Sequence, residues 1–210
     1  DLVNDPEYKD LLTAASHISG KTINRFTHIH QNPEDLLLKQ KMTRRMCNYT
    51  GGCIMRCMGI DAMNGLSVVT KNTDLKYGTS YNERFLKYLE YFQENDIVAS
   101  CAQTDPKGDR RFRPGEQSDP DQHLRVVERR ADGVVVRGAK LHNTMSPYAD
   151  EIIAIPTRAL LKTETDYAIA FAIPADTEGV YLIGRKATYG HRDAGMEAPI
   201  ADYGDIESFT

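Results

Sequence analysis

The sequence contains no tryptophan, no long apolar run and little excess charge of either sign. No apolar run approaches the roughly 20 residues that a transmembrane helix needs, so we expect no membrane partner. The formal net charge is −4 and the arginines form only local clusters, so we expect no nucleic-acid partner. The first residues are acidic and lack the basic start and apolar core of a signal peptide, which favours a cytoplasmic protein.

Cysteine is also scarce, with 4 in 210 residues, and this number is too small for a disulfide scaffold. Three of them, Cys47, Cys53 and Cys57, lie in one short stretch. Such clustering predicts a reducing compartment and a metal or redox role. The rest of the composition, 40% hydrophobic and 27% charged, is that of a globular protein with enough chain for a core in one or two domains.

The first part of the sequence has the apolar spacing of helices. Residues 6–19 fit this spacing and predict a first helix. Asn32, followed by proline and two acids, predicts the start of a helix that continues to Met46. Residues 53–69 and 81–95 show helical spacing again, so the cysteine stretch is expected on, or at the start of, a helix.

After residue 96 the pattern changes to short apolar runs separated by turn residues. The expected strands are residues 97–102, 124–128, 134–136, 151–155, 167–173 and 180–183. An Asp-Gly pair in the turn at residues 131–133 predicts a hairpin between two of them. Residues 187–210 return to no clear packed element, so we expect an incompletely closed sheet that needs a partner surface. The fold class is therefore α+β, a helical part followed by an antiparallel β part.

Cys53 and Cys57 are four residues apart, which on a helix places both thiols on one face. Two soft thiolates on one face can hold a metal ion or part of an iron–sulfur cluster. The spacing by itself favours a plainer interpretation, two small apolar side chains in a helix core. Cys47 points elsewhere around the helix and Cys101 follows on a strand, so any further cluster ligands are expected outside this chain.

Two loops carry polar side chains that suit a ligand. Residues 101–110 follow a strand and combine backbone amides, a threonine hydroxyl and basic side chains. Such groups could hold a phosphate or the polar edge of a flavin ring, although an ordinary charged surface loop has the same composition. Residues 138–147 follow the predicted hairpin and form either a simple turn or a second wall of the same ligand site.

Six segments, in this order along almost the whole chain, resemble the flavin-dependent 4-hydroxyphenylacetate 3-hydroxylase family, and within it the 4-hydroxybutyryl-CoA dehydratase branch. These segments are Lys41–Met46, Cys53–Asn64, Tyr77–Thr79, Glu94–Asp96, Thr104–Arg110 and Asp132–Lys140. The resemblance implies an acyl-CoA dehydrogenase-like fold. Residues 1–96 would be its N-terminal helical domain and residues 97–210 its middle antiparallel β-barrel or sandwich. The C-terminal helical bundle of the family would lie beyond this chain.

The resemblance also implies two cofactors, FAD and one [4Fe–4S] cluster. Cys53 and Cys57 match two of the cluster's cysteine ligands, and the remaining ligands would come from beyond this chain. The residues expected to contact the flavin are Gln103, Thr104, Asp105, Lys107, Asp109, Arg110, His142, Asn143 and Thr144. No catalytic base can be assigned, and Cys47 and Cys101 receive no role.

The activity implied is the dehydration of 4-hydroxybutyryl-CoA to crotonyl-CoA by a radical route, together with isomerisation of vinylacetyl-CoA. The complete enzyme would be an oxygen-sensitive homotetramer. A chain that lacks two cluster ligands and the helical bundle is expected to be inactive when isolated.

Two other functions remain open at this point. A two-component FADH2-dependent aromatic 3-monooxygenase of the same family would need no cluster, and so would have no use for thiolates at Cys53 and Cys57. A cofactor-free chain could instead serve only as a binding or assembly module.

Overall fold

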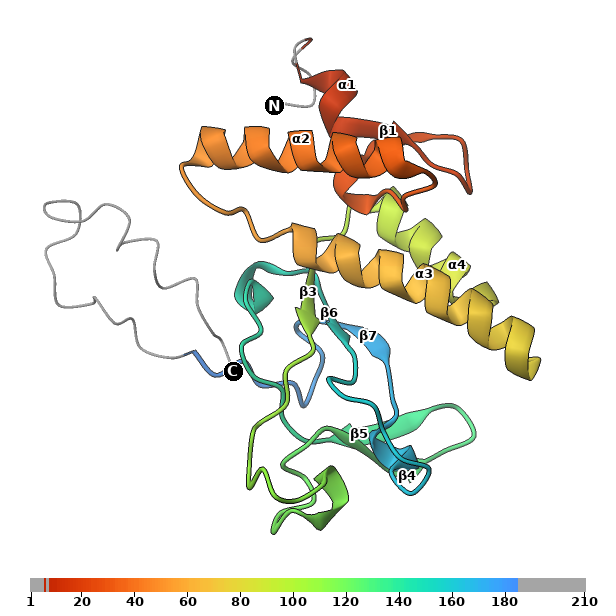
Figure 1. The fold of residues 1–210 in the computed structure, drawn as a ribbon, viewed down its shortest axis with the longest axis vertical. Coiled ribbons are helices and arrows are strands. Elements are labelled where there is room, and N and C mark those ends of the chain that lie inside the picture. The colour runs from red at the N-terminus through yellow and green to blue at the C-terminus, as the bar shows by residue number, and fades with distance from the viewer. Residues whose placement is uncertain (1–5, 7, 185–210) are drawn as a thin grey trace, which may run out of the picture. The chain divides into compact units, whose positions relative to one another are not determined.

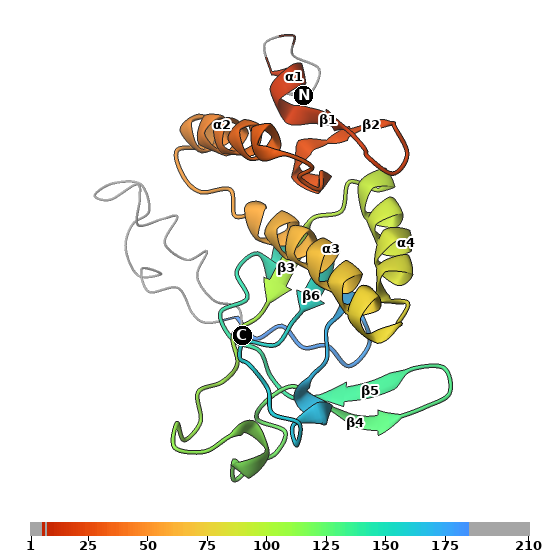
Figure 2. The same ribbon diagram turned by 45° about the vertical axis from the view of Figure 1, so that its right-hand side comes forward.

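The computed structural model describes residue 6 and residues 8–184. The chain divides into two compact units, Asp1–Ala99 and Ser100–Thr210. Figures 1 and 2 show the long helices in the first unit and short strands in the second. The mixed α+β content agrees with the predicted fold class. That residues 1–96 and 97–210 are two separate domains, one helical and one β, stays a prediction.

The N-terminal segment is mostly not helical, so the first predicted helix is wrong beyond Leu12. Helix α1 covers only Lys9–Leu12, and strand β1 (Thr13–Ala15) follows at once. It pairs in antiparallel fashion with β2 (Thr22–Asn24), with Ala14 opposite Ile23. The turn between them uses Gly20 at a φ of 69°, a left-handed conformation that suits glycine. Pairing of the two strands therefore overrides the local helical spacing.

Helix α2 (Pro33–Thr50) begins as the sequence predicts and runs one turn longer than expected. The Asn32 side chain accepts a hydrogen bond from the Asp35 backbone N–H at 3.1 Å, which satisfies one free donor of the first turn. Gly51 ends the helix with a φ of 75°. On the inner side of α2, Met42 packs with Leu12 and Phe26, which follows β2 in a short 3₁₀ turn (Arg25–Thr27).

Helix α3 (Cys57–Tyr77) begins four residues later than predicted. The segment between α2 and α3 has no helical turn at Cys53, because Gly51 and Met55 both adopt positive φ, 75° and 55°. The prediction that both cysteines sit on one helix is therefore wrong: Cys57 is the first helical residue and Cys53 precedes it in the connecting loop.

Helix α4 (Tyr81–Glu94) confirms the predicted fourth helix and packs against α3. Its buried face carries Phe85, Leu89 and Phe92. In the first turn of α3, Gly59 lets the helix pack very closely against the backbone of Ala99. A Cβ atom there would lie 2.5 Å from the carbonyl oxygen of Ala99. No side chain larger than hydrogen fits between α3 and this backbone.

The second unit contains a three-stranded sheet in the order β3–β6–β7, of which only the first residue, Ala99, belongs to the first unit. Strand β3 covers Ala99–Ala102, β6 covers Glu151–Ala154 and β7 covers Phe171–Pro174. Strands β6 and β7 are antiparallel, with Ile152 opposite Ile173. Ala102, Ile152 and Ala154 form the buried cluster of this sheet.

The predicted hairpin is confirmed as strands β4 (Arg125–Arg129) and β5 (Val134–Arg137). They pair in antiparallel fashion, with an irregularity between Val126 and Glu128. Three short 3₁₀ turns, at Pro114–Glu116, Ser146–Tyr148 and Thr165–Tyr167, complete the regular structure of this unit.

The β part is less regular than predicted. Residues 180–183 form no strand, because they follow turns that end at Gly179 (φ of 86°) and expose Tyr181 and Ile183 rather than burying one face. The strand predicted from Tyr167 begins only at Phe171, after a 3₁₀ turn. Residues 8–184 show no closed barrel. The expectation for residues 187–210 falls outside the described residues.

Of the helices described, none combines the length and apolar character needed to cross a membrane.

Candidate cofactor sites

The cysteine pair lies at the junction between the α2–α3 loop and the start of α3. Cys57 is half-buried and Cys53 is exposed, and neither forms a disulfide. Burial, followed by the nearby Cys53 thiol and the Asp61 carboxylate, raises the pKa of the Cys57 thiol. Cys47 lies half-buried on α2, and Cys101 is buried on β3.

The backbone around Cys57 is fixed from both sides. The preceding residue, Arg56, donates hydrogen bonds to Asp96, at 2.6 Å to Oδ1 and 3.0 Å to the carbonyl oxygen. Gly59 makes the close contact with Ala99 described above. One turn beyond Cys57, Asp61 forms an ion pair with Lys39 of α2. The first turn of α3 is therefore held in place while the Cys53 side of the pair stays accessible.

The cysteine pair is an incomplete ligand set. In the part of the chain that the structure describes, no group of three or more His, Cys, Asp or Glu side chains could hold a metal ion. An iron–sulfur cluster takes four protein ligands, most often thiolates. Cys53 and Cys57 fit such a cluster in ligand type and lie four residues apart, and they would supply half of its ligands.

In the second unit, the two polar loops predicted as one site lie side by side. The Leu141 backbone N–H donates a 2.8 Å hydrogen bond to the Thr104 carbonyl oxygen. The Thr157 hydroxyl donates to the Gln103 carbonyl oxygen, which ties the first loop to the chain after β6. The structure thus brings together Gln103, Thr104 and Asp105 with the start of the second loop.

Lys140 links the two loops and is the main polar residue that the sequence did not single out. Its ammonium group donates to Asp105 Oδ1 at 2.6 Å and to the carbonyl oxygens of Gln103 and Ile155 at 3.0 and 2.9 Å. The side chains of Lys140 and Asp105 are only 9% and 12% exposed. All three donors of the ammonium group are used, so this buried ion pair is a clamp rather than a free cation.

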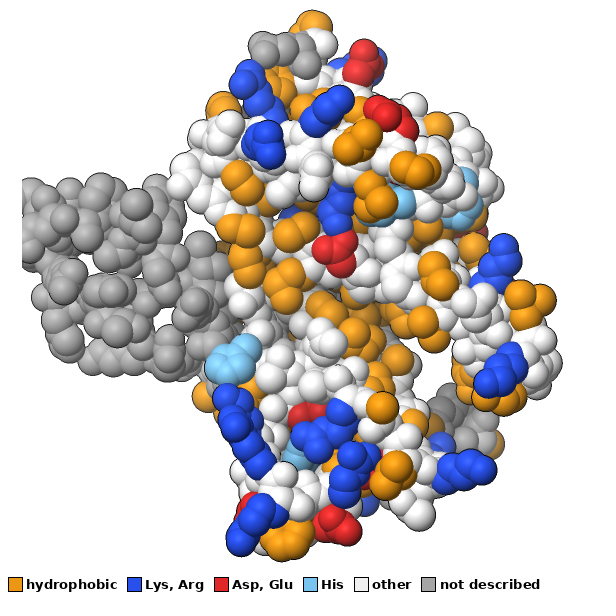
Figure 3. Space-filling view, viewed as in Figure 1, with side chains coloured by type: hydrophobic (Ala, Val, Ile, Leu, Met, Phe, Trp, Pro, Cys, Tyr) orange, Lys and Arg blue, Asp and Glu red, His pale blue; other side chains and the backbone are white. Residues whose placement is uncertain are grey.

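The other residues of the first loop fall into two groups. Asp109 is engaged within its own loop, since Arg111 donates to both of its carboxylate oxygens, and these bonds lower the pKa of Asp109. Lys107 and Arg110 are exposed. On the face drawn in Figure 3, basic side chains gather over the second unit. Lys107 and Arg110 can reach a ligand, whereas Asp109 mainly stabilises the loop.

The second loop buries Asn143 and turns sharply at His142 and Met145, which both have positive φ. His142 is exposed and Thr144 is half-buried. The Asn143 side-chain N–H donates to the Lys140 carbonyl oxygen at 3.1 Å. The three predicted residues of this loop therefore face three different environments.

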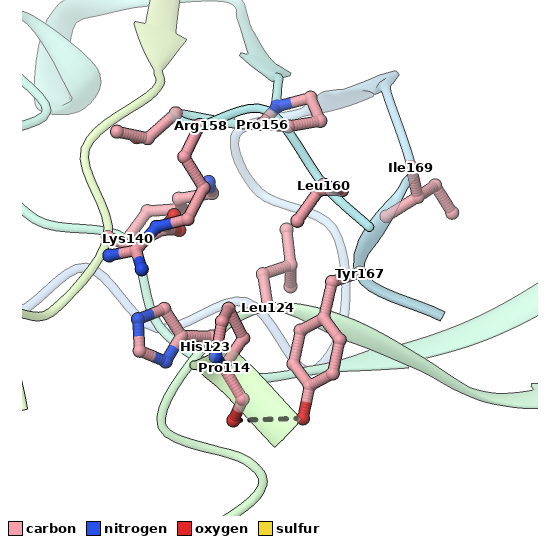
Figure 4. A pocket seen from close by; sticks show the side chains of 11 residues that line it. Pro114, His123, Leu124, Lys140, Pro156, Arg158, Leu160, Tyr167 and Ile169 are labelled. Carbon is pink, nitrogen blue, oxygen red and sulfur yellow. Dashed lines mark hydrogen bonds and ion pairs between the residues drawn. The ribbon is translucent and has the colours of Figure 1, made fainter. Parts of the chain in front are cut away.

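A small cavity lies beside the clamp (Figure 4). Asp105, His123, Lys140, Arg158 and Tyr167 are among its lining residues. Its free volume is about 10 Å³, room for about one water molecule. His123 is 2% exposed, and burial lowers the pKa of its imidazole. This cavity is too small for a flavin ring, so a flavin would have to lie on the loops rather than inside it.

Comparisons with known proteins agree with one another. The family model described as 4-hydroxyphenylacetate 3-hydroxylase N terminal matches residues 1–210. The chain is 48% identical over 188 residues to 4-hydroxybutyryl-CoA dehydratase/vinylacetyl-CoA-Delta-isomerase of Clostridium aminobutyricum, covering 89% of this chain and 38% of that protein. It is 29% identical over 201 residues to the 4-hydroxyphenylacetate 3-monooxygenase oxygenase component of Thermus thermophilus, covering 96% of this chain and 40% of that protein.

Solved structures give the same two groups of relatives. An oxygen-tolerant archaeal 4-hydroxybutyryl-CoA dehydratase from N. maritimus matches with a TM-score of 0.86 and 40% identity, covering 96% of this chain and 41% of that one. The oxygenase component of 4-hydroxyphenylacetate 3-monooxygenase, complexed with FAD, matches with a TM-score of 0.77 and 27% identity, covering 99% and 42%. The chain thus spans about two fifths of the length of these relatives.

Proposed function

The chain belongs to the 4-hydroxyphenylacetate 3-hydroxylase N-terminal family, and on that premise we propose that it is the N-terminal and middle part of an FAD- and [4Fe–4S]-dependent 4-hydroxybutyryl-CoA dehydratase. The enzyme would convert 4-hydroxybutyryl-CoA to crotonyl-CoA and water by a radical route and would isomerise vinylacetyl-CoA. The observation that carries this choice is the 48% identity to the clostridial dehydratase, against 29% to the Thermus monooxygenase component.

Cys53 and Cys57 would hold the iron–sulfur cluster from this chain. Their fit is supported by their four-residue spacing and by the anchored start of α3 on which Cys57 sits. Both thiols must lose their protons to bind iron, and the exposed Cys53 leaves the pair accessible to an incoming cluster. The remaining ligands would come from residues outside the described ranges.

The two loops of the second unit would hold the flavin. Thr104 and Leu141 join their backbones, and the Lys140–Asp105 clamp fixes their separation. Gln103, Lys107, Arg110, His142, Asn143 and Thr144 would complete the contact surface proposed from the resemblance. Support comes from the solved relatives of the same family that are complexed with FAD.

The residues that are assigned to the two sites would bind, orient and fix the cofactors. When bound, the flavin supplies one-electron chemistry and the cluster supplies a Lewis-acidic iron. The clamp at Lys140 keeps the flavin loops from separating, and the anchored first turn of α3 keeps Cys57 in place. No carboxylate or imidazole of the described residues is assigned as the base that removes a substrate proton.

The complete protein is proposed to have an acyl-CoA dehydrogenase-like architecture, with the helical bundle beyond this chain. Its substrate would be an acyl-CoA thioester and its assembly a homotetramer in the cytoplasm. The isolated 210-residue chain is expected to form no crotonyl-CoA, because its described residues offer only the Cys53–Cys57 pair, half of the ligands that a cluster takes.

The function is tested by assaying the full-length protein with 4-hydroxybutyryl-CoA, under air and in a sealed anaerobic vessel, and following crotonyl-CoA by chromatography. The two atmospheres are needed because oxygen sensitivity is part of the proposal while one relative is described as oxygen tolerant. Formation of crotonyl-CoA in at least one of them is expected. Its absence in both, from protein that contains flavin and iron, would contradict the proposed reaction.

A second candidate function is an FADH2-dependent aromatic 3-monooxygenase. It is favoured by the match of 99% of the chain to an FAD-complexed oxygenase component at a TM-score of 0.77. The two functions differ in their need for iron. Hydroxylation of 4-hydroxyphenylacetate by iron-free protein supplied with FADH2 would select the monooxygenase.

A further inference from the structure

A tight loop at His142–Met145 lies between Lys140 and the 3₁₀ turn Ser146–Tyr148 that precedes β6. His142 and Met145 have φ angles of 54° and 72°, in a region that residues other than glycine rarely occupy. Strained backbone of this kind persists only where surrounding contacts fix it, and it concentrates at ligand sites. The loop must therefore be held by its neighbours.

Two buried serines hold it. Ser100 on β3 is 0% exposed and Ser146 is 1% exposed. The Ser146 hydroxyl donates to the Asn143 carbonyl oxygen at 2.7 Å, and the Ser100 hydroxyl donates to the Thr144 carbonyl oxygen at 3.1 Å. Both carbonyl groups of the loop centre are thus bound by serine side chains.

The two serines act as a unit. Their Oγ atoms are 2.9 Å apart, so one hydroxyl can donate to the other. Each hydroxyl has a single hydrogen, and three contacts share the two hydrogens available. Neither serine has a spare donor for a ligand, so any effect on a ligand passes through the loop.

Asn143 shows which chemistry the loop presents. It is 9% exposed, and its side-chain N–H group is occupied by the Lys140 carbonyl oxygen. Its Oδ1 atom is buried and finds no hydrogen-bond partner in the described part of the chain. A buried acceptor without a donor is costly and points to a donor supplied by a ligand. The oxidised flavin ring carries one such donor, the N–H between its two pyrimidine carbonyl groups.

We propose that Ser100 and Ser146 are positioning residues that hold the 142–145 loop in the shape that lets Asn143 accept a hydrogen bond from the flavin ring N–H. This inference rests on the proposed flavin site. It adds Ser100, which lies in neither of the two polar loops, and it gives a specific role to Ser146 of the second loop. It also assigns Asn143 a single contact with the flavin, through its side-chain oxygen Oδ1.

The test is an FAD titration of the full-length apoprotein and of its Ser100→Ala and Ser146→Ala variants, followed by flavin absorbance and fluorescence. Each variant is expected to weaken FAD binding by up to about tenfold, the effect of one lost hydrogen bond, and to shift the visible absorbance bands of bound flavin. Because the two hydroxyls share hydrogens, the double variant should lose less than the product of the two single effects.

The matched control is Ser16→Ala. Ser16 is 3% exposed, and its hydroxyl donates to Gln93 in the first unit at 2.6 Å, so its loss tests the general cost of removing a buried hydroxyl. This variant should lose thermal stability but keep the FAD affinity and spectrum. If Ser100→Ala does not fold, Ser146→Ala carries the same test, since it leaves the Ser100 contact in place.

Each outcome decides one question. Unchanged FAD affinity and spectrum in a folded Ser100→Ala or Ser146→Ala variant would overturn the positioning role. An equal loss of affinity in Ser16→Ala would overturn it as well. A wild-type protein that binds no FAD would instead contradict the proposed function.

Discussion

The two candidate cofactor sites differ in how much of each is complete within this chain. The cysteine pair has an exposed thiol and only half of the ligands that a cluster takes. The loops of the second unit are tied together by a buried ion pair and by buried serine hydroxyls, with one acceptor left open at Asn143. The described residues can fix only part of the cluster site, because its other ligands come from elsewhere. The loops of the second unit can instead be held in their binding conformation before the flavin binds.

The largest effect is expected at the cysteines. Cys53→Ala or Cys57→Ala should remove nearly all cluster iron from the full-length protein and abolish crotonyl-CoA formation, because either change leaves too few ligands. Flavin content should stay unchanged if the flavin site is built by the second unit. Iron and flavin are measured together on the purified variants.

The control for this experiment is Cys47→Ala on α2, which should keep both cofactors. Full iron content in Cys57→Ala, or loss of iron in Cys47→Ala, would show that the ligands have been assigned wrongly.

The next largest effect is expected at the clamp. Lys140→Met should lower the free energy of unfolding by about 3 kcal/mol or more, because it leaves Asp105 as a buried, unpaired carboxylate. Chemical denaturation of the full-length protein measures the change. The double variant Lys140→Met with Asp105→Leu should recover part of the loss. No recovery would mean that Lys140 stabilises the protein through its contacts with the backbone rather than through the ion pair.

A smaller effect should follow from closing the space at Gly59. Gly59→Ala places a Cβ atom 2.5 Å from the Ala99 carbonyl oxygen, which should destabilise the protein by about 1–3 kcal/mol through overpacking. Gly65→Ala is the matched control on the same helix, since its Cβ would meet nothing within 4 Å. It should stabilise α3 by about 0.5–1 kcal/mol. Equal effects of the two variants would exclude close packing as the reason for glycine at position 59.

The smallest effect is a pH dependence at His123. Burial lowers the pKa of His123 in the folded protein, so the unfolded chain binds its proton more readily. Stability should therefore fall as the pH drops below the ordinary histidine value of about 6.5, towards the lower folded value. His123→Gln should flatten this part of the stability curve. A curve that His123→Gln does not alter would contradict a buried neutral imidazole.

The parts of the fold that the sequence predicts correctly are those set by local chemistry. Asn32 starts α2 through its own side chain, and the Asp-Gly pair at residues 132–133 lies in the turn between β4 and β5. The errors come from pairing or strain that no short window reveals. Strand β1 exists because β2 pairs with it, and α3 starts at Cys57 because two nearby residues have positive φ.

In the candidate sites, too, local sequence and distant contacts contribute different features. The spacing of the cysteines and the order of the polar motifs selected the stretches that carry the candidate sites, and the assignment of ligands within them stays a prediction. The roles of Lys140 and Ser100 depend on partners 35 and 44 residues away, Asp105 and Thr144. A lysine or a serine has nothing in its local sequence that indicates such a contact. Lys140 could have been noticed only as the one basic side chain of the second loop.

The presence of both cofactors is measured most directly by the iron, acid-labile sulfide and flavin content of the full-length protein, purified anaerobically. A cluster held in part by Cys53 and Cys57 predicts about four iron and about four sulfide per chain, together with bound FAD. A yellow flavoprotein without iron or sulfide would contradict the dehydratase proposal and favour the monooxygenase.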